Sequence, residues 1–143
     1  MHLRTFLFCL LALSSVAARP ATQAFDARVV GITDGDTITV LDARDVQHRI
    51  RLAGIDAPEK GQPFAERSRQ SLRRPVMGRP VRVEWPAPDR YGRLVGKVWV
   101  TPVGLNCAQE PCPKTLDAGR AQLTVGLAWH YLGRHQGEED SLA

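Results

Sequence analysis

The stretch FDARVVGITDGDTITVLDARDVQHRIRLAGI, residues 25–55, decides the fold of this chain. Apolar and polar residues alternate in three runs that are separated by Asp- and Gly-containing turn segments. This pattern predicts three consecutive strands, over residues 25–32, 37–41 and 48–55. In the third strand Ile50 and Leu52 share one face and Arg51 lies on the other, because successive side chains point to opposite sides.

The remaining elements follow from the sequence beyond Pro58, which ends the third strand. A helix is expected over residues 63–74, with Phe64, Ser68 and Leu72 on one face and Pro75 as its stop. Further elements are expected as strands over 81–85 and 94–100 and as a second helix over 116–127, capped by Thr115 or Asp117. The predicted fold class is therefore α+β, mainly β: a five-stranded OB-type barrel with added helices.

The N-terminal 18 residues have the layout of a secretory signal peptide. His2 and Arg4 precede an apolar run over residues 6–13, and small residues then lead to an expected cleavage site after Ala17 or Ala18. The apolar run is too short to span a bilayer. We expect export to the periplasm or the medium, with no stable membrane association after cleavage. The folded domain is expected over 25–132 and a short tail over 133–143.

The cysteines agree with an exported protein. Cys9 lies in the predicted signal peptide, which leaves Cys107 and Cys112 in the mature chain. In an oxidising compartment this pair is expected to form a disulfide that closes a small ring. The alternative, half of a zinc site, lacks a second Cys or His pair at ligand spacing.

Length and charge narrow the class of protein. A chain of 143 residues supports one domain, and a hydrophobic fraction of 43% argues against wholesale disorder. The formal net charge of +4 favours a polyanionic partner, although only mildly.

Three clusters carry the chemistry: residues 34–37 (Asp-Gly-Asp-Thr), 51–59 and 89–93 (Asp-Arg-Tyr-Gly-Arg). Each cluster alone is typical of a turn or a strand end. Together they offer carboxylate oxygens for a hard cation, a further carboxylate for a water molecule, and two arginines for a phosphate. This set of side chains is what metal-assisted phosphodiester cleavage requires.

With these motifs in this order, the chain resembles the staphylococcal nuclease-like (thermonuclease) family from about Phe25 to Tyr131. A further matching segment is Gly-Leu-Ala-Trp at residues 126–129. The resemblance implies an OB barrel and a calcium-dependent nuclease that cuts DNA and RNA with little sequence preference. It favours single-stranded nucleic acid as substrate and a monomeric protein.

The resemblance assigns the metal site residue by residue. Asp36 and Asp56 would ligate calcium through their side chains, and Ala57 would ligate it through its backbone carbonyl. Asp34 would support these ligands without touching the ion.

The resemblance also assigns the substrate site. Glu59 would act as the general base or position the attacking water, and Arg51 and Arg93 would bind the scissile phosphate. Tyr91 and Arg90 would contact the nucleotide. The implied mechanism is in-line attack of water with departure of the 5′-oxygen, which leaves a 3′-phosphate. The alternative function is a non-catalytic OB module that binds single-stranded nucleic acid, for which Glu59 and the arginine pair would not be needed.

The C-terminal segment departs from the family pattern. Family members continue after Tyr131 through a charged helix that packs on the barrel, whereas this sequence stops at Ala143. That helix is expected to be missing or truncated. Because burying one helix contributes several kcal/mol, we expect a marginally stable protein.

Overall fold

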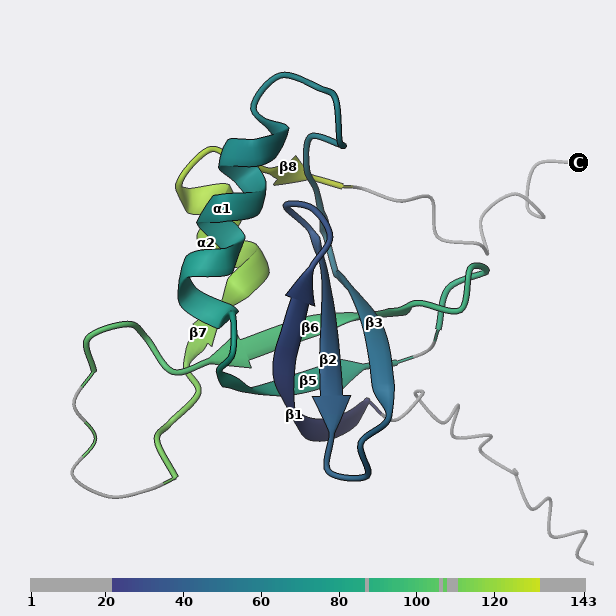
Figure 1. The fold of residues 1–143 in the computed structure, drawn as a ribbon, viewed down its shortest axis with the longest axis vertical. Helices are drawn as coiled ribbons and strands as arrows, with labels where there is room; N and C mark the ends of the chain where they lie inside the picture. The colour runs from purple at the N-terminus through teal and green to yellow at the C-terminus, as the bar shows by residue number, and fades with distance from the viewer. Residues whose placement is uncertain (1–21, 87, 106, 108–110, 132–143) are drawn as a thin grey trace, which may run out of the picture.

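The computed structural model describes residues 22–131, except 87, 106 and 108–110. The predicted signal peptide over 1–18 and the predicted tail over 133–143 lie outside the described residues. Figure 1 shows a β-barrel with two helices packed side by side against one end of it.

Five strands form the barrel: β1 (Gln23–Ile32), β2 (Thr37–Asp42), β3 (Gln47–Leu52), β5 (Pro80–Trp85) and β6 (Leu94–Val100). Antiparallel pairing joins β3 to β2, β2 to β1, β1 to β5 and β5 to β6. A parallel pairing between β3 and β6 closes the circle. A two-residue strand, β7 (Leu116–Asp117), pairs with the last two residues of β6, Trp99 and Val100. A closed five-stranded barrel with two helices confirms the predicted OB-type α+β fold.

The barrel interior is filled by the apolar faces of all five strands. Side chains with no exposed surface come from alternate positions, as the period of a strand requires. They are Val29, Ile38, Val40, Ile50, Val81, Val83, Val98 and Val100. Leu72 and Val76 of the first helix extend the same core. β-branched residues dominate this set because they pack well on a pleated sheet.

The third predicted strand ends earlier than expected. The alternation of residues 48–55 predicts one strand, but β3 ends at Leu52 and a turn follows at Ala53 and Gly54. Gly54 has φ 74°, a left-handed conformation that suits glycine. The chain then forms β4 (Ile55–Asp56), which pairs with β8 (Trp129–His130) in a separate two-stranded sheet. Asp56 thereby lies beside the C-terminal end of the described chain.

The first helix, α1 (Ala65–Val76), starts and ends later than predicted. Phe64 was expected on its buried face, but this residue begins the helix in the left-handed conformation and is 61% exposed. Pro75 was expected to stop the helix, but it lies inside the last turn. Arg79 Nη1 donates to the Pro75 carbonyl at 2.8 Å, and the Met77 N–H still reaches the Arg73 carbonyl at 3.0 Å.

The second helix, α2 (Ala118–Thr124), is shorter than predicted. Asp117 caps it as expected, because its carboxylate accepts the N–H groups of Gly119 and Arg120. The helix ends early because Gly126 has φ 69°. The N–H of Gly126 donates to Leu123 and that of Leu127 to Gln122, which is a Schellman C-cap. Neither described helix has the length and apolar character needed to cross a bilayer.

Candidate active site

Asp36 lies in the turn between β1 and β2 and is almost fully buried, with 5% of its surface exposed. Asp34 holds the turn, since its carboxylate accepts the Asp36 N–H at 3.2 Å. The Thr37 hydroxyl donates to Asp36 Oδ1 at 2.7 Å, and the Ala57 N–H donates to Oδ2 at 3.2 Å. The Asp36 carboxylate is therefore fixed in one orientation by neighbours from two segments.

Arg51 bridges the two predicted metal-binding carboxylates. Its Nη1 donates to Asp36 Oδ2 at 2.5 Å and its Nη2 donates to Asp56 Oδ1 at 3.0 Å. Desolvation works against the charged guanidinium, but the hydrogen bonds and charges of Asp36 and then Asp56 outweigh it and raise the pKa of Arg51. A positive charge thus already lies between the two acids.

These groups line one cavity of about 200 Å³. It brings together all the residues predicted to bind metal, to support it or to act on the phosphate: Asp34, Asp36, Arg51, Asp56, Ala57, Glu59 and Arg93. Thr37 and Tyr131 complete the lining. Glu59 is exposed, and its N–H is anchored by the side-chain oxygen of Gln62 at 2.8 Å. Tyr91 and Arg90, the predicted nucleotide contacts, do not line this cavity.

Asp89 positions Arg93 on the loop between β5 and β6. Its Oδ2 accepts Arg93 Nε at 2.8 Å, and its Oδ1 accepts the N–H groups of Tyr91 and Arg93 at 2.9 Å each. Desolvation acts to raise the pKa of Asp89, but the hydrogen bonds from Arg93 and Tyr91 outweigh it and lower that pKa. The exposed Tyr91 ring lies under two guanidinium groups, Arg90 at 4.9 Å and Arg93 at 5.4 Å. Tyr91 and Arg90 therefore lie next to the cavity, on the Arg93 side.

The donor set suits a hard cation. Among the described residues no three Asp, Glu, His or Cys side chains already form a metal-binding group. Two carboxylates nevertheless converge on one positive group, the Arg51 guanidinium, at hydrogen-bond distance. Hard divalent cations take carboxylate and carbonyl oxygens and complete their coordination with water or substrate. Asp36, Asp56 and the adjoining backbone at Ala57 fit that requirement.

Several residues at the site escaped the sequence analysis. Thr37 and Asp89 belong to the quoted motifs, and their local hydrogen bonds are typical of turn residues. For Tyr131 the sequence left open a base-stacking role; the residue lines the cavity, and its ring lies 5.5 Å from the Arg51 guanidinium. Tyr131 reaches the cavity because its N–H donates to the Gly54 carbonyl, a long-range contact without a local sequence signal.

Cys107 and Cys112 lie in the long connection between β6 and β7. The structure pairs them in a disulfide, with their Cα atoms 5.6 Å apart. Neither cysteine lines the acid–arginine cavity.

The fold and the cavity together define a class of protein: an OB-type barrel with two aspartates, a glutamate and two arginines at one end. Residues 49–142 match the family model described as staphylococcal nuclease homologue. The chain belongs to the staphylococcal nuclease family. The nucleases of this family are metal-dependent hydrolases of phosphodiester bonds.

Curated relatives agree with this assignment. The chain is 45% identical over 117 residues to "Protein ParB" of Escherichia coli, and 39% identical over 137 residues to "Micrococcal nuclease" of Shigella flexneri. It is 46% identical over 104 residues to an "Uncharacterized endonuclease" of Escherichia coli O157:H7. These matches cover 81%, 85% and 73% of this chain, but 63%, 71% and 60% of the relatives' own lengths.

Proposed function

We propose that this protein is a calcium-dependent nuclease that hydrolyses phosphodiester bonds of DNA and RNA with little sequence preference. One observation carries the proposal. The Arg51 guanidinium bridges the buried Asp36 and the part-buried Asp56. Glu59 and Arg93 line the same cavity as these three residues. Binding to a nucleic-acid backbone requires positive charge alone, whereas hydrolysis also requires carboxylates placed beside a phosphate.

Asp36, Asp56 and the carbonyl of Ala57 would hold the calcium ion. A bound divalent ion supplies Lewis-acid polarisation of the phosphate and favours ionisation of water. The fixed orientation of Asp36 supports this assignment, because four neighbouring groups, on Asp34, Thr37, Arg51 and Ala57, hold the residue in place. A rigid ligand loses little entropy when it binds.

The two arginines divide the phosphate contacts between them. Arg93 is held at Nε by Asp89, and within the described part of the chain its other nitrogens make no ion pair. Those nitrogens can donate to the equatorial oxygens of a phosphate, whose charge grows in the transition state. Arg51 would add a second pair of donors to the phosphate, with Asp36 and Asp56, its partners in the structure, holding the ion.

Glu59 is the group proposed to act on water. It is exposed at the rim of the cavity, and its backbone is fixed by the bond to Gln62. A carboxylate there can orient a water molecule in line with the scissile bond and accept its proton. Departure of the 5′-oxygen would leave products that carry a 3′-phosphate.

The proposed substrate is a single strand, and the proposed state of the protein is a monomer. A base that has left its stack could lie on the exposed Tyr91 ring, which is 68% accessible. The signal-peptide pattern of residues 1–18 and the pairing of Cys107 with Cys112 support export to the periplasm or the medium.

The direct experiment is digestion of single-stranded DNA and RNA by the purified protein with calcium, with magnesium and with a chelator. The proposal expects cleavage of both nucleic acids with calcium, loss of cleavage with the chelator, and 3′-phosphate ends. Cleavage that persists in the chelator would refute the metal requirement. Binding without cleavage in calcium would favour a binding module instead.

A further inference from the structure

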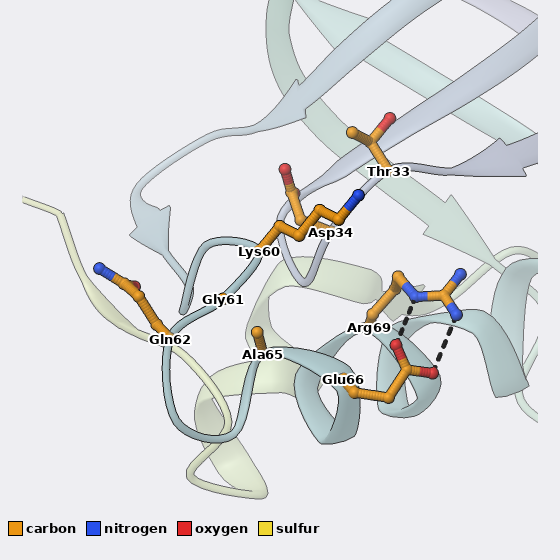
Figure 2. A pocket seen from close by; sticks show the side chains of 8 residues that line it. All are labelled: Thr33, Asp34, Lys60, Gly61, Gln62, Ala65, Glu66 and Arg69. Atoms are coloured by element: carbon orange, nitrogen blue, oxygen red, sulfur yellow. Dashed lines mark hydrogen bonds and ion pairs between the residues drawn. The ribbon is translucent and has the colours of Figure 1, made fainter.

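A second pocket adjoins the acid–arginine cavity and has no role in the chemistry described above. Its volume is about 510 Å³, and its walls come from the β1–β2 turn, the loop of residues 60–62 and the first turns of α1. Asp34 lines both this pocket and the acid–arginine cavity, so the two lie next to each other. We call it the Lys60 pocket; Figure 2 shows it from close by.

Lys60 supplies the available positive charge of this pocket. Its side chain extends toward Thr33 and Asp34 (Figure 2), and it makes no ion pair with any described residue. Lys60 is exposed, so its ammonium group remains accessible to a ligand from solvent. An ammonium group in this position can pair with a phosphate as a point charge.

Two further charged side chains of the pocket, Arg69 and Glu66, pair with each other. Arg69 donates from Nε and Nη2 to the two carboxylate oxygens of Glu66, at 2.9 Å each. The bidentate hydrogen bond to Arg69 lowers the pKa of Glu66 to about 2, so this pair stays charged on both sides and adds no net charge. Asp34 lines both cavities, and its carboxylate accepts the Asp36 N–H.

The position of the pocket suits a strand that passes through the cavity. A polynucleotide whose scissile phosphate lies between Arg51 and Arg93 must leave the cavity in two directions. One direction leads past Arg93 to Tyr91. Neither Arg93 nor Tyr131 lines the Lys60 pocket, and none of its lining residues belongs to the β5–β6 loop. The pocket therefore lies on the other path.

We propose that the Lys60 pocket is a second nucleotide subsite. It would hold the sugar–phosphate unit that adjoins the scissile phosphodiester on the side away from Tyr91, with Lys60 paired to that unit's phosphate. The apolar surface of Ala65 and the side chain of Thr33 would face the sugar. The volume lies within the range of small-molecule sites, about 300–1,000 Å³. The inference rests on the proposed nuclease function.

The pocket and the proposed base share one short loop. The Gln62 N–H donates to the Glu59 carbonyl at 2.9 Å, and the Gln62 side chain accepts the Glu59 N–H. This tight turn places Lys60 next to Glu59 while the two side chains line different cavities. A strand with one phosphate bound at Lys60 would therefore have its neighbouring scissile phosphate placed beside Glu59.

The test compares a single-stranded hexanucleotide with a dinucleotide, which has no adjoining phosphodiester. We expect Lys60→Gln to lower the ratio of kcat/KM for the hexanucleotide to that for the dinucleotide by about tenfold, the size of one charged contact. Binding of a labelled hexanucleotide is measured in the chelator at several salt concentrations. In Lys60→Gln the slope of log binding constant against log salt should become less steep by about 0.7, which corresponds to the loss of one phosphate contact. Arg44→Gln, which removes one exposed charge in the β2–β3 turn, is the matched control.

Other outcomes decide against the subsite. Equal losses of kcat/KM for the hexanucleotide and the dinucleotide would mean that Lys60 acts through Glu59. If Lys60→Gln and Arg44→Gln had the same kcat/KM ratio and the same salt slope, a specific contact at Lys60 would be excluded. If the unmutated protein cleaves neither substrate, the proposed function fails separately. The salt slope then decides alone: an unchanged slope in Lys60→Gln refutes the subsite, and a reduced slope supports it.

Discussion

At the scale of single residues, Arg51 has two sets of possible partners. In the structure its guanidinium bridges Asp36 and Asp56 and is only 16% exposed. In the proposed reaction it would bind a phosphate, and Asp36 and Asp56 would hold the metal ion instead of the guanidinium. Arg51 would then compensate the two acids in the metal-free protein and compete with the metal ion for them.

This competition predicts opposite effects of Arg51→Gln on metal binding and on stability. Without the guanidinium, calcium affinity measured by calorimetry in the absence of nucleic acid should rise several-fold. In a chelator, the free energy of unfolding should fall by about 1–3 kcal/mol, because two charged hydrogen bonds are lost. Arg49→Gln, an exposed neighbour on the same strand, should change neither quantity. Unchanged calcium affinity in Arg51→Gln would contradict the competition.

At the scale of elements, one buried glutamine ties both helices to the turn that carries Asp36. Gln122 Nε2 donates to the Gly35 carbonyl and to the Ser68 carbonyl at 2.9 Å each. The Ser68 hydroxyl in turn donates to the Leu127 carbonyl at 2.6 Å. Gly35 must be glycine because a Cβ there would collide with the side chains of Ser68 and Ala57. The position of Asp36 therefore depends on the packing of α1 and α2.

Gln122→Met tests this connection, because methionine has a similar shape but no hydrogen-bond donor. The buried Gly35 carbonyl would lose this donor, so we expect the free energy of unfolding to fall by about 1–3 kcal/mol in urea denaturation. Calcium affinity should fall as well, because the turn that holds Asp36 loosens. Gln47→Met on the exposed face of β3 is the control. If Gln122→Met lowered the free energy of unfolding and the calcium affinity no more than Gln47→Met does, the helices would not hold the turn.

At the scale of the whole molecule, local patterns predicted the barrel strands well. The run from Leu94 to Val100 matches β6 at both ends, because its alternation is bounded by turn residues. The predicted strand over 48–55 and the predicted helix over 116–127 were too long, because Gly54 and Gly126 adopt left-handed conformations that end these elements earlier. Pro75 was misread because a proline in the last helical turn removes few hydrogen bonds.

The candidate site could be predicted only in part, for a similar reason. The acids and arginines are recognisable as motifs, and the family resemblance assigned their roles. The bridge from Arg51 to both aspartates was not predictable, because it depends on the closure of the barrel by β3 and β6. The Gln122 contact spans 87 residues, and the pairing of β4 with β8 spans a similar distance. No local pattern carries such information.

The cavity is proposed to cleave phosphodiester bonds with Glu59 acting on water. The decisive variant is Glu59→Gln, assayed by single-turnover cleavage of a single strand in calcium, with the dissociation constant of the same strand measured in parallel. The control Asp45→Asn removes an exposed carboxylate in the β2–β3 turn, away from the cavity. We predict a loss of at least about 100-fold in rate with little change in affinity. An unchanged rate, or equal losses in rate and affinity, would contradict the claim.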